Sequence, residues 1–330
     1  MNMPAIKTLV LAIALSLSLA CLTACENSDA GQTVSSQASN SAASSSSAGS
    51  SSSTSSTNVE PTDVEDKKPN EELKPKKKRL EAILGDETAA LLIKRAETDM
   101  DAAWIAAHPD AYEKYGAELQ EKLLKLAADD PLAIPFVRGF PEKAYADGPN
   151  LKAPAMDKKI HVKGIPKTKI PHLYQWDLRW GYAKFSADGF GLAACGPTSL
   201  TMIYQGLTGK TDITPYDMGR MAEEQGFVIA GSGSTNDLFI EMPLQLGLNR
   251  WEIPVNTDSM RETLSAGYPI IANVGPGYFS RVGHFFVLAG ITEDGKVILN
   301  DPYSVERSSK LWDPEQIASE SRALYAYDKA

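Results

Sequence analysis

The order of helical and extended patterns in residues 170–330 predicts an α+β domain with an antiparallel sheet. Helix signals fill residues 197–267, and apolar runs typical of strands follow in residues 269–300. The last two runs, 284–291 and 296–300, are separated by the sequence Thr-Glu-Asp-Gly, which is typical of a β-hairpin turn. Helices that come before the strands, instead of alternating with them, favour antiparallel pairing in the sheet.

Three helices are predicted in this domain from their end signals. The first spans about 197–209, with a proline at its start and a glycine at its end. The second has Thr214 as N-cap, Pro215 at its first position and Gly226 at its end. The third, 257–267, begins at a capping threonine.

Residues 80–145 are predicted to form a small helical module in front of this domain. Apolar residues with helical spacing indicate one helix over 86–108, which Asp86 caps and a His-Pro pair ends. A second helix is expected over 110–128. No chemistry-bearing motif is found in the module.

The N-terminus predicts export and lipidation. Lys7 precedes the apolar run Leu9 to Ala20, which is short for a membrane span and typical of a secretory signal. The next residues, Leu22-Thr23-Ala24-Cys25, resemble the bacterial lipoprotein signal, in which the cysteine is lipidated. We therefore expect residues 1–24 to be cleaved and Cys25 to anchor the protein at the outer face of the cytoplasmic membrane. An ordinary signal peptide that contains cysteines is the alternative.

Residues 25–79 are predicted to be a disordered tether, because serine dominates most of this stretch and nothing in it can bury a core. The tether ends in a basic run from Lys74 to Arg79. Such a run is usually solvated, and near a lipid anchor it can also contact anionic headgroups.

The net charge argues against one class of function, and the cysteine count singles out one candidate reactive residue. The 330-residue chain has a net charge of −9, which argues against a nucleic-acid binder. Of its three cysteines, Cys21 lies in the predicted signal and Cys25 is the lipidation candidate, so Cys195 alone remains in the folded part. A single thiol in an oxidising compartment is either well buried or kept for its reactivity.

Cys195 lies just before the start of the helix predicted at 197–209, where the helix dipole favours a thiolate. This placement makes it a candidate nucleophile. The alternative is a buried cysteine that packs the helix onto the sheet, since free cysteine is among the most buried residue types.

A thiol nucleophile needs a base, and the chain has only four histidines. His108 and His161 fall in surface or loop contexts, and His172 remains possible. His284 opens the apolar run 284–291, where a polar ring must find a partner. His284 is therefore the candidate base, with a satisfied core histidine as the alternative.

The predicted hairpin indicates which acidic residue lies beside His284. If Ile291 pairs with Lys296, then His284 faces Tyr303. Asp301 becomes the diagonal neighbour of His284 on the same face, within side-chain reach. Asp301 is therefore the candidate orienter of the imidazole, with the turn chemistry of an Asp-Pro pair as the alternative.

Other turns would change this result. A tighter turn that pairs Glu293 with Lys296 keeps the parity but moves Asp301 farther from His284. A loop of odd length would favour Asn300 instead. For the oxyanion, Gln175 in the sequence Tyr-Gln-Trp-Asp-Leu-Arg-Trp is a candidate side-chain donor, although an isolated glutamine is more often a surface residue.

Four motifs occur in the order Gln175 to Gly181, Cys195 to Ser199, Gly283 to Phe285 and Asn300 to Pro302. Together they resemble papain-fold peptidases of family C39, and more closely its extracellular C39-like branch. The resemblance covers about residues 165–325 of the predicted domain 165–330. It implies a papain-like fold with Cys195 as nucleophile, His284 as general base and acid, Asp301 as orienter and Gln175 as oxyanion donor.

The resemblance also implies a substrate class. The transporter-linked branch cuts after a double glycine, but this sequence shows neither a transmembrane bundle nor a P-loop pattern. We therefore expect a monomeric, membrane-anchored extracellular cysteine peptidase that acts on external peptides or proteins, without a cofactor, a metal or a nucleic-acid partner.

Two alternatives remain at this stage. One is a cell-wall peptidoglycan endopeptidase or amidase, because such enzymes also pair cysteine with histidine. The other is a non-catalytic peptide-binding lipoprotein on the same scaffold. For the second, Trp180, Trp251 and Trp312 are candidates to line a ligand groove, although such aromatic residues more often belong to the core.

Overall fold

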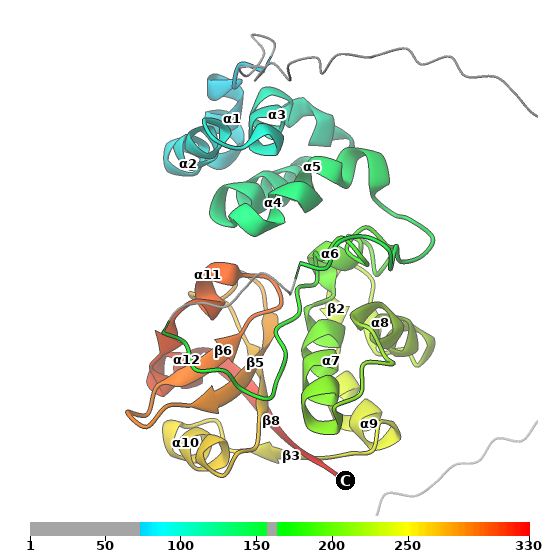
Figure 1. The fold of residues 1–330 in the computed structure, drawn as a ribbon, viewed down its shortest axis with the longest axis vertical. Coiled ribbons are helices and arrows are strands. Elements are labelled where there is room, and N and C mark those ends of the chain that lie inside the picture. The colour runs from blue at the N-terminus through cyan, green and yellow to red at the C-terminus, as the bar shows by residue number, and fades with distance from the viewer. Residues whose placement is uncertain (1–72, 157–163) are drawn as a thin grey trace, which may run out of the picture. The chain divides into compact units, whose positions relative to one another are not determined.

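The computed structural model describes residues 73–156 and 164–330, which lie in one compact unit, residues 65–330 (Figure 1). The predicted signal 1–24, Cys25 and nearly all of the predicted tether lie outside the described residues, as does His161. Within residues 73–156 and 164–330, no helix is both long and apolar enough to cross a membrane.

The N-terminal part of the described chain is helical. Its elements are α1 (Lys77–Leu84), α2 (Asp86–Ala96), α3 (Met100–Ala107), the 3₁₀ helix η1 (Pro109–Tyr115), α4 (Ala117–Asp129), the 3₁₀ helix η2 (Pro131–Ala133) and α5 (Ile134–Lys143).

Two of the helix predictions here are wrong. The single helix expected over 86–108 is interrupted before α3, where the Asp99 side chain accepts the N–H of Ala102 and starts a new helix as N-cap. The helix expected over 110–128 begins as η1, and Gly116 at φ 89° separates it from α4. That backbone angle favours glycine, which explains the break.

The C-terminal part combines helices with a sheet. Its elements are α6 (Phe190–Ala193), α7 (Cys195–Thr208), α8 (Pro215–Glu224), β1 (Val228–Ile229), β2 (Gly233–Ser234), α9 (Asp237–Gln245), β3 (Leu248–Ile253), α10 (Thr257–Ser265), β4 (Ile270–Val274), β5 (His284–Ile291), β6 (Val297–Asn300), α11 (Val305–Ser308), β7 (Leu311–Trp312), α12 (Pro314–Glu320) and β8 (Ser321–Lys329).

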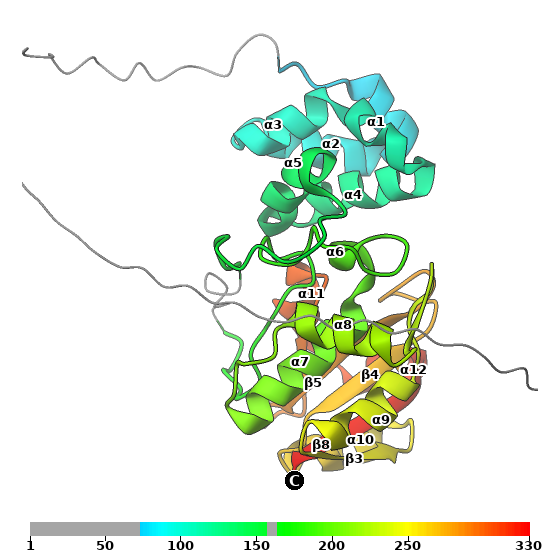
Figure 2. The ribbon, with the colours of Figure 1, turned by 90° about the vertical axis from the view of Figure 1, so that its right-hand side faces the viewer.

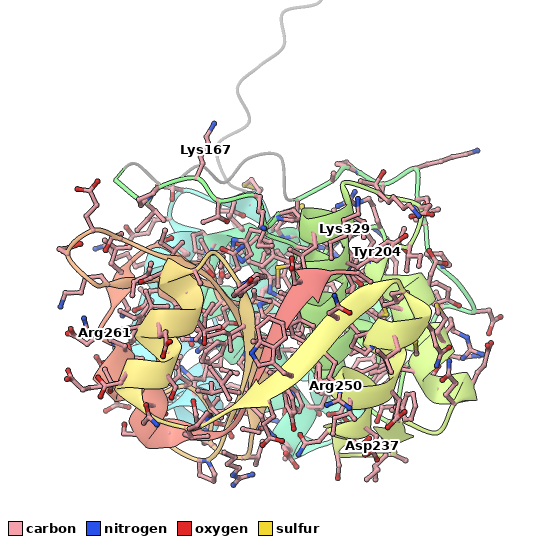
Figure 3. The ribbon with its side chains drawn as sticks, turned by 90° about the horizontal axis from the view of Figure 1, so that it is seen from below. Lys167, Tyr204, Asp237, Arg250, Arg261 and Lys329 are labelled. Atoms are coloured by element: carbon pink, nitrogen blue, oxygen red, sulfur yellow. The ribbon has the colours of Figure 1, made fainter. Side chains whose placement is uncertain are left out.

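The main sheet has the strand order β3-β8-β4-β5-β6-β7, and every pair in it is antiparallel. The predicted α+β class is therefore confirmed. Strands β3 and β8 were not predicted. They form one edge of the sheet, and Figure 3 labels Arg250 of β3 there. Its Nε donates to the Ile240 carbonyl of α9 at 3.0 Å.

Helices cover both faces of the sheet. Figure 2 shows α7, α8 and α9 in front of β4 and β5. Because side chains alternate along a strand, Phe285 and Val287 of β5 pack with Leu200 of α7. Phe286 and Leu288 pack on the opposite face, which α10 and α12 cover. The strand that begins at His284 is therefore buried on both sides.

Two of the tryptophans named as groove candidates line cavities, Trp180 one of about 870 Å³ and Trp251 one of about 300 Å³. Trp180 and Trp312 are buried in core clusters. Trp251 is half-buried against one of these clusters.

The predicted helix caps have mixed outcomes. At α2 the prediction is wrong, because Gly85 is the N-cap and Asp86 is the first residue of the helix. The side chain of Thr214 accepts the N–H of Asp217 and completes a capping box, so the predicted cap of α8 is confirmed. For α10 the prediction is wrong by one residue. Asn256, not Thr257, is the N-cap, and its side chain accepts the N–H of Ser259.

The β5–β6 hairpin differs from the predicted register at its turn. Ile291 pairs with Val297 instead of Lys296, so the loop between the strands has an odd number of residues. An odd loop by itself turns Asn300, rather than Asp301, to the face of His284.

A β-bulge in β5 reverses this shift. The register changes around Ala289, which is the extra residue of the bulge. Beyond the bulge Val287 lies opposite Asn300, as in the predicted register. The next residue, Asp301, therefore lies on the same face as His284.

The helical part shares a hydrophobic core with the segment that follows it. One core cluster contains residues of α2 to α5 together with Tyr174, Trp176 and Leu192. The contact is close, because a Cβ added at Gly191 would lie 2.4 Å from Cζ of Phe136 in α5. The helices of residues 77–143 therefore pack against the segments on either side of Gln175 and just before Cys195.

Candidate active site

Cys195 is the first residue of α7, and its side chain is half-buried. No side chain caps this helix, and its third residue is Pro197, which has no N–H. The amides at the start of α7 therefore favour a negative charge next to them, either on the thiolate or on a bound oxyanion.

Two contacts fix the start of α7. The Ser199 hydroxyl donates to the Phe285 carbonyl at 3.2 Å and ties α7 to β5, one residue after His284. Gly196 lies against the β1–β2 hairpin, where an added Cβ would come 2.5 Å from Oγ of Ser234. The position next to Cys195 therefore has no room for a side chain.

His284 lies between the thiol and a carboxylate. Its Nε2 donates to Oδ1 of Asp301 at 2.8 Å, and its side chain interacts electrostatically with Cys195. Because Nε2 is engaged by the carboxylate, the other ring nitrogen is the one available to the thiol. The side chain of His284 is only 10 % exposed, so this geometry is shielded from water.

The charges favour a thiolate–imidazolium pair. Burial raises the pKa of the Cys195 thiol, but the hydrogen bond and positive charge of His284 outweigh it, so the pKa is lowered. Burial lowers the pKa of His284, but the charge and hydrogen bond of Asp301 outweigh it and raise the pKa to about 9. Both shifts stabilise the charged forms of the pair.

Asp301 is fully buried, and both of its carboxylate oxygens are engaged. Oδ1 accepts from His284 and from the N–H groups of Tyr303 at 2.7 Å and Ser304 at 3.1 Å. Oδ2 accepts from Nε of Arg307 at 2.6 Å. Burial raises the pKa of Asp301, but the charges of Arg307 and His284 outweigh it and hold that pKa well below its usual range.

The other two described histidines have different partners. Nε2 of His172 donates to the backbone carbonyl of Asp301 at 2.8 Å, so His172 lies behind the carboxylate residue and not beside its side chain. His108 bonds the Trp104 carbonyl through Nδ1 at 2.8 Å, in the helical part. Of the histidines in residues 73–156 and 164–330, His284 alone contacts the Cys195 side chain in the interactions described.

Asn300 points away from the pair. Its side-chain amide donates to the carbonyls of Ile170 at 3.2 Å and Pro171 at 3.3 Å. It therefore holds the chain that enters the domain, on the face opposite Asp301.

Gln175 lies between the segment that follows Asp301 and the segment that leads to Cys195. Its backbone N–H donates to the Pro302 carbonyl at 2.8 Å, next to Asp301. Its side-chain amide donates to the Gly191 carbonyl at 3.0 Å, four residues before Cys195 in the chain. The residue is buried, and its role as oxyanion donor stays a prediction.

Residues 167–329 match the model of the Peptidase_C39 like family. They form a C39-like, papain-like peptidase domain.

Among solved structures, the chain is similar to the peptidase domain of Streptococcus ComA, a bi-functional ABC transporter involved in a quorum sensing pathway. The two are 20 % identical, the match covers 42 % of this chain and 92 % of that chain, and the TM-score is 0.32. No curated protein sequence matches the chain.

Sequence reasoning missed the residues of the C39-like domain that hold Asp301. Arg307 and Ser308 both come from α11, a helix of one turn, and Ser308 Oγ accepts the N–H of Asp301 at 2.9 Å. The signal was Ser304, which caps α11 by accepting the N–H of Arg307. A serine three residues after Asp301 indicates a helix start that folds back onto the carboxylate.

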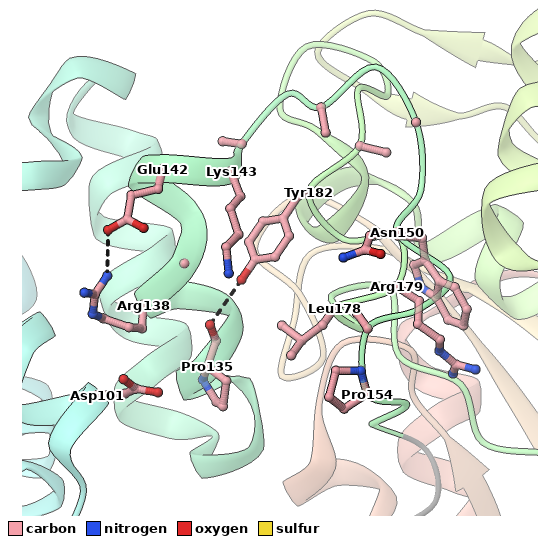
Figure 4. A pocket seen from close by; sticks show the side chains of 17 residues that line it. Asp101, Pro135, Arg138, Glu142, Lys143, Asn150, Pro154, Leu178, Arg179 and Tyr182 are labelled. Atoms are coloured by element: carbon pink, nitrogen blue, oxygen red, sulfur yellow. Dashed lines mark hydrogen bonds and ion pairs between the residues drawn. The ribbon is translucent and has the colours of Figure 1, made fainter. Parts of the chain in front are cut away.

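A cavity of about 870 Å³ lies apart from these groups (Figure 4). Residues of α3 and α5 line one side of it, and residues 144–154 and 178–183 line the rest. Cys195, His284, Asp301 and Gln175 do not line this cavity. Across the described ranges 73–156 and 164–330, acidic, histidine and cysteine side chains form no cluster that could hold a metal ion.

Proposed function

We propose that the C39-like domain is an active thiol peptidase that hydrolyses peptide bonds through Cys195, His284 and Asp301. One observation carries the proposal. A half-buried thiol at a helix N-terminus interacts with an imidazole whose Nε2 is held by a buried carboxylate at 2.8 Å. This arrangement of nucleophile, base and orienter supports acyl transfer.

The proposed reaction has two stages. The Cys195 thiolate attacks the carbonyl carbon of the substrate, and the protonated His284 gives its proton to the leaving amine, which leaves a thioester on sulfur. A water molecule then gives a proton to His284 and attacks the thioester. This step releases the acid and restores the Cys195 thiolate beside the protonated His284.

Two groups are proposed to stabilise the oxyanion of each stage. The first is the backbone N–H of Cys195 at the start of α7, where no side chain competes for it. The second is the side-chain amide of Gln175, which keeps one N–H beyond the one it donates to Gly191. Asp301 keeps the imidazole oriented during both proton transfers.

We also propose that Cys25 carries a lipid and that the peptidase therefore acts on peptides outside the cytoplasmic membrane. The sequence from Leu22 to Cys25 and the apolar run before it support this proposal. Metabolic labelling with a fatty-acid probe tests it. The wild-type protein should take up the label and sediment with membranes, and Cys25→Ser should do neither.

A peptide library tests the peptidase proposal. Full-length protein is incubated with the library, and new termini are identified by mass spectrometry, with Cys195→Ala as control. Wild type should produce cleavages that the variant does not. Purified peptidoglycan forms a second arm, and cleavage only there would favour the cell-wall enzyme. If wild type binds peptides tightly, cleaves none and takes up no thiol-directed probe, the peptidase proposal is wrong.

A further inference from the structure

Arg307 occupies the oxygen of Asp301 that His284 does not use. Its Nε donates to Oδ2 at 2.6 Å, while His284 donates to Oδ1 at 2.8 Å. The carboxylate is therefore held from two sides by two different cations. The Arg307 side chain is 18 % exposed and that of Asp301 is fully buried, so solvent screens this ion pair weakly.

We propose that Arg307 is a positioning residue of the peptidase site, which fixes the Asp301 carboxylate and offsets its charge so that His284 can exchange its proton with substrate. The proposal rests on the peptidase function proposed above. It assigns Arg307 no contact with substrate, because the described contacts of its guanidinium are with Asp301.

The first part of the argument is geometric. A carboxylate can rotate about its bond to Cβ, and rotation would move Oδ1 away from His284. Arg307 opposes that rotation from the second oxygen, and the N–H groups of Tyr303 and Ser304 oppose it from the first. Charge-assisted bonds of this length are among the stronger ones in proteins.

The second part concerns how rigidly Arg307 itself is held. Its N–H donates to the Ser304 side chain at 3.2 Å, and its carbonyl accepts from Nε1 of Trp312 at 2.8 Å. Ser308, on the same turn of helix, accepts the N–H of Asp301. The one-turn helix α11 therefore holds both the backbone and the side chain of Asp301.

The third part is electrostatic. The titratable groups that face the pair are His284, Cys195 and Tyr174 near Asp301, His172 at the Asp301 backbone, and Tyr303 and Tyr278 beside Arg307. Without Arg307, the negative charge of Asp301 would act on His284 without a counter-charge. The imidazolium would then be held more tightly and would release its proton only at higher pH.

Full-length variants test the proposal with two readouts. Arg307→Met removes the charge, and Arg307→Lys keeps the charge without the planar guanidinium. Arg250→Met is the matched control, because Arg250 lies on the edge strand β3 and bonds the Ile240 carbonyl of α9, away from Asp301. The first readout is the NMR titration of the His284 imidazole, assigned with His284→Ala. The second is kcat and KM on the best library peptide.

For Arg307→Met we expect the His284 midpoint to move to higher pH and kcat to fall about 10- to 100-fold, with KM nearly unchanged. Arg307→Lys should return the midpoint to the wild-type value and recover only part of kcat. If Arg307→Met does not fold, the Lys variant alone carries the test, with an unchanged midpoint and a lower kcat expected.

An unchanged midpoint and unchanged kcat in folded Arg307→Met would overturn the proposal, as would a Lys variant whose midpoint differs from wild type. The two proposals fail separately. If the wild type cleaves no peptide, the peptidase function fails, but the His284 titration still reports whether Arg307 acts on His284 through Asp301.

Discussion

His284 and Asp301 meet because two irregularities of one hairpin cancel. The β5–β6 loop is longer by one residue than the predicted turn, because Lys296 belongs to the loop and β6 begins at Val297. The bulge at Ala289 adds one residue to β5 and restores the predicted pairing. As a result Nε2 of His284 lies 2.8 Å from Oδ1 of Asp301. The same register sends the Asn300 amide to the carbonyls of Ile170 and Pro171.

Asp301→Asn should keep the fold and lower kcat on the order of 10²- to 10⁴-fold, because a neutral amide neither stabilises the imidazolium nor enforces its orientation. Asn300→Ala is the matched change on the other face. It should reduce stability through the lost bonds to Ile170 and Pro171 and leave kcat within a few-fold of wild type. Steady-state kinetics at fixed pH, with circular dichroism for folding, check both. A greater loss of kcat in Asn300→Ala would show that the orienter is misassigned.

The pH dependence of kcat/KM should have a high-pH limb near the pKa of His284, about 9. The imidazolium must give its proton to the leaving amine, so activity is lost as pH rises through that value. On the acid side, His284 lowers the pKa of the Cys195 thiol, so the thiolate should form below the usual thiol range. Initial rates across a wide pH range check this. A rate that only rises toward alkaline pH, as for an isolated thiol, would contradict the ion pair.

Asp130→Asn should gain stability relative to the wild type as pH rises from acidic to neutral. Asp130 is buried where its carboxylate accepts the N–H groups of Leu132 at 3.1 Å and Val305 at 2.8 Å, and burial raises its pKa to about 6. An acid with a raised folded-state pKa loses stability as pH rises from its unfolded value through the folded one. At neutral pH the ionised group therefore costs up to about 3 kcal/mol, at 1.36 kcal/mol per pKa unit.

Urea unfolding at pH 4.5 and 7.5 measures this effect. The free-energy difference between Asp130→Asn and wild type should grow in favour of the variant at the higher pH. A difference that does not depend on pH would mean that Asp130 does not titrate in this range.

Gly196→Ala should lower both stability and activity, because the added Cβ would lie 2.5 Å from Oγ and 2.7 Å from Cβ of Ser234. Overpacking of this kind costs about 1–3 kcal/mol and would displace the start of α7 beside Cys195. Ser234→Gly in the same chain removes the clashing atoms and should recover most of both losses. If the double variant is no better than Gly196→Ala, the close approach of β2 is not the cause.

The sequence predicted features set by local pattern, such as the Thr214 cap, the strand beginning at His284 and the α+β class. It did not predict the bulge at Ala289, because a bulge is decided by packing on both faces of the strand and not by local propensity. The agreement between the predicted and observed neighbour of His284 depends on that bulge.

The contacts of Arg307 and Ser308 with Asp301 were not predicted, for a related reason. Arg307 lies in Ser-Val-Glu-Arg-Ser-Ser, a polar sequence typical of a surface loop. Ser304, the N-cap of α11, could be recognised in the sequence. A one-turn helix, however, has too little periodicity to be predicted. The break before α3 was also readable, because Asp99 is a typical N-cap, although the apolar spacing across it favoured one continuous helix.

The most direct test of the account is whether the reactivity of Cys195 depends on His284. An epoxysuccinyl peptide is added to full-length wild type and to His284→Ala at pH 7, and adduct formation at Cys195 is followed by intact mass and peptide mapping. The account predicts rapid labelling of the wild type and labelling slower by about 100-fold or more in the variant, which retains the thiol but not its base. Equal labelling of the two proteins, or none in the wild type, would contradict it.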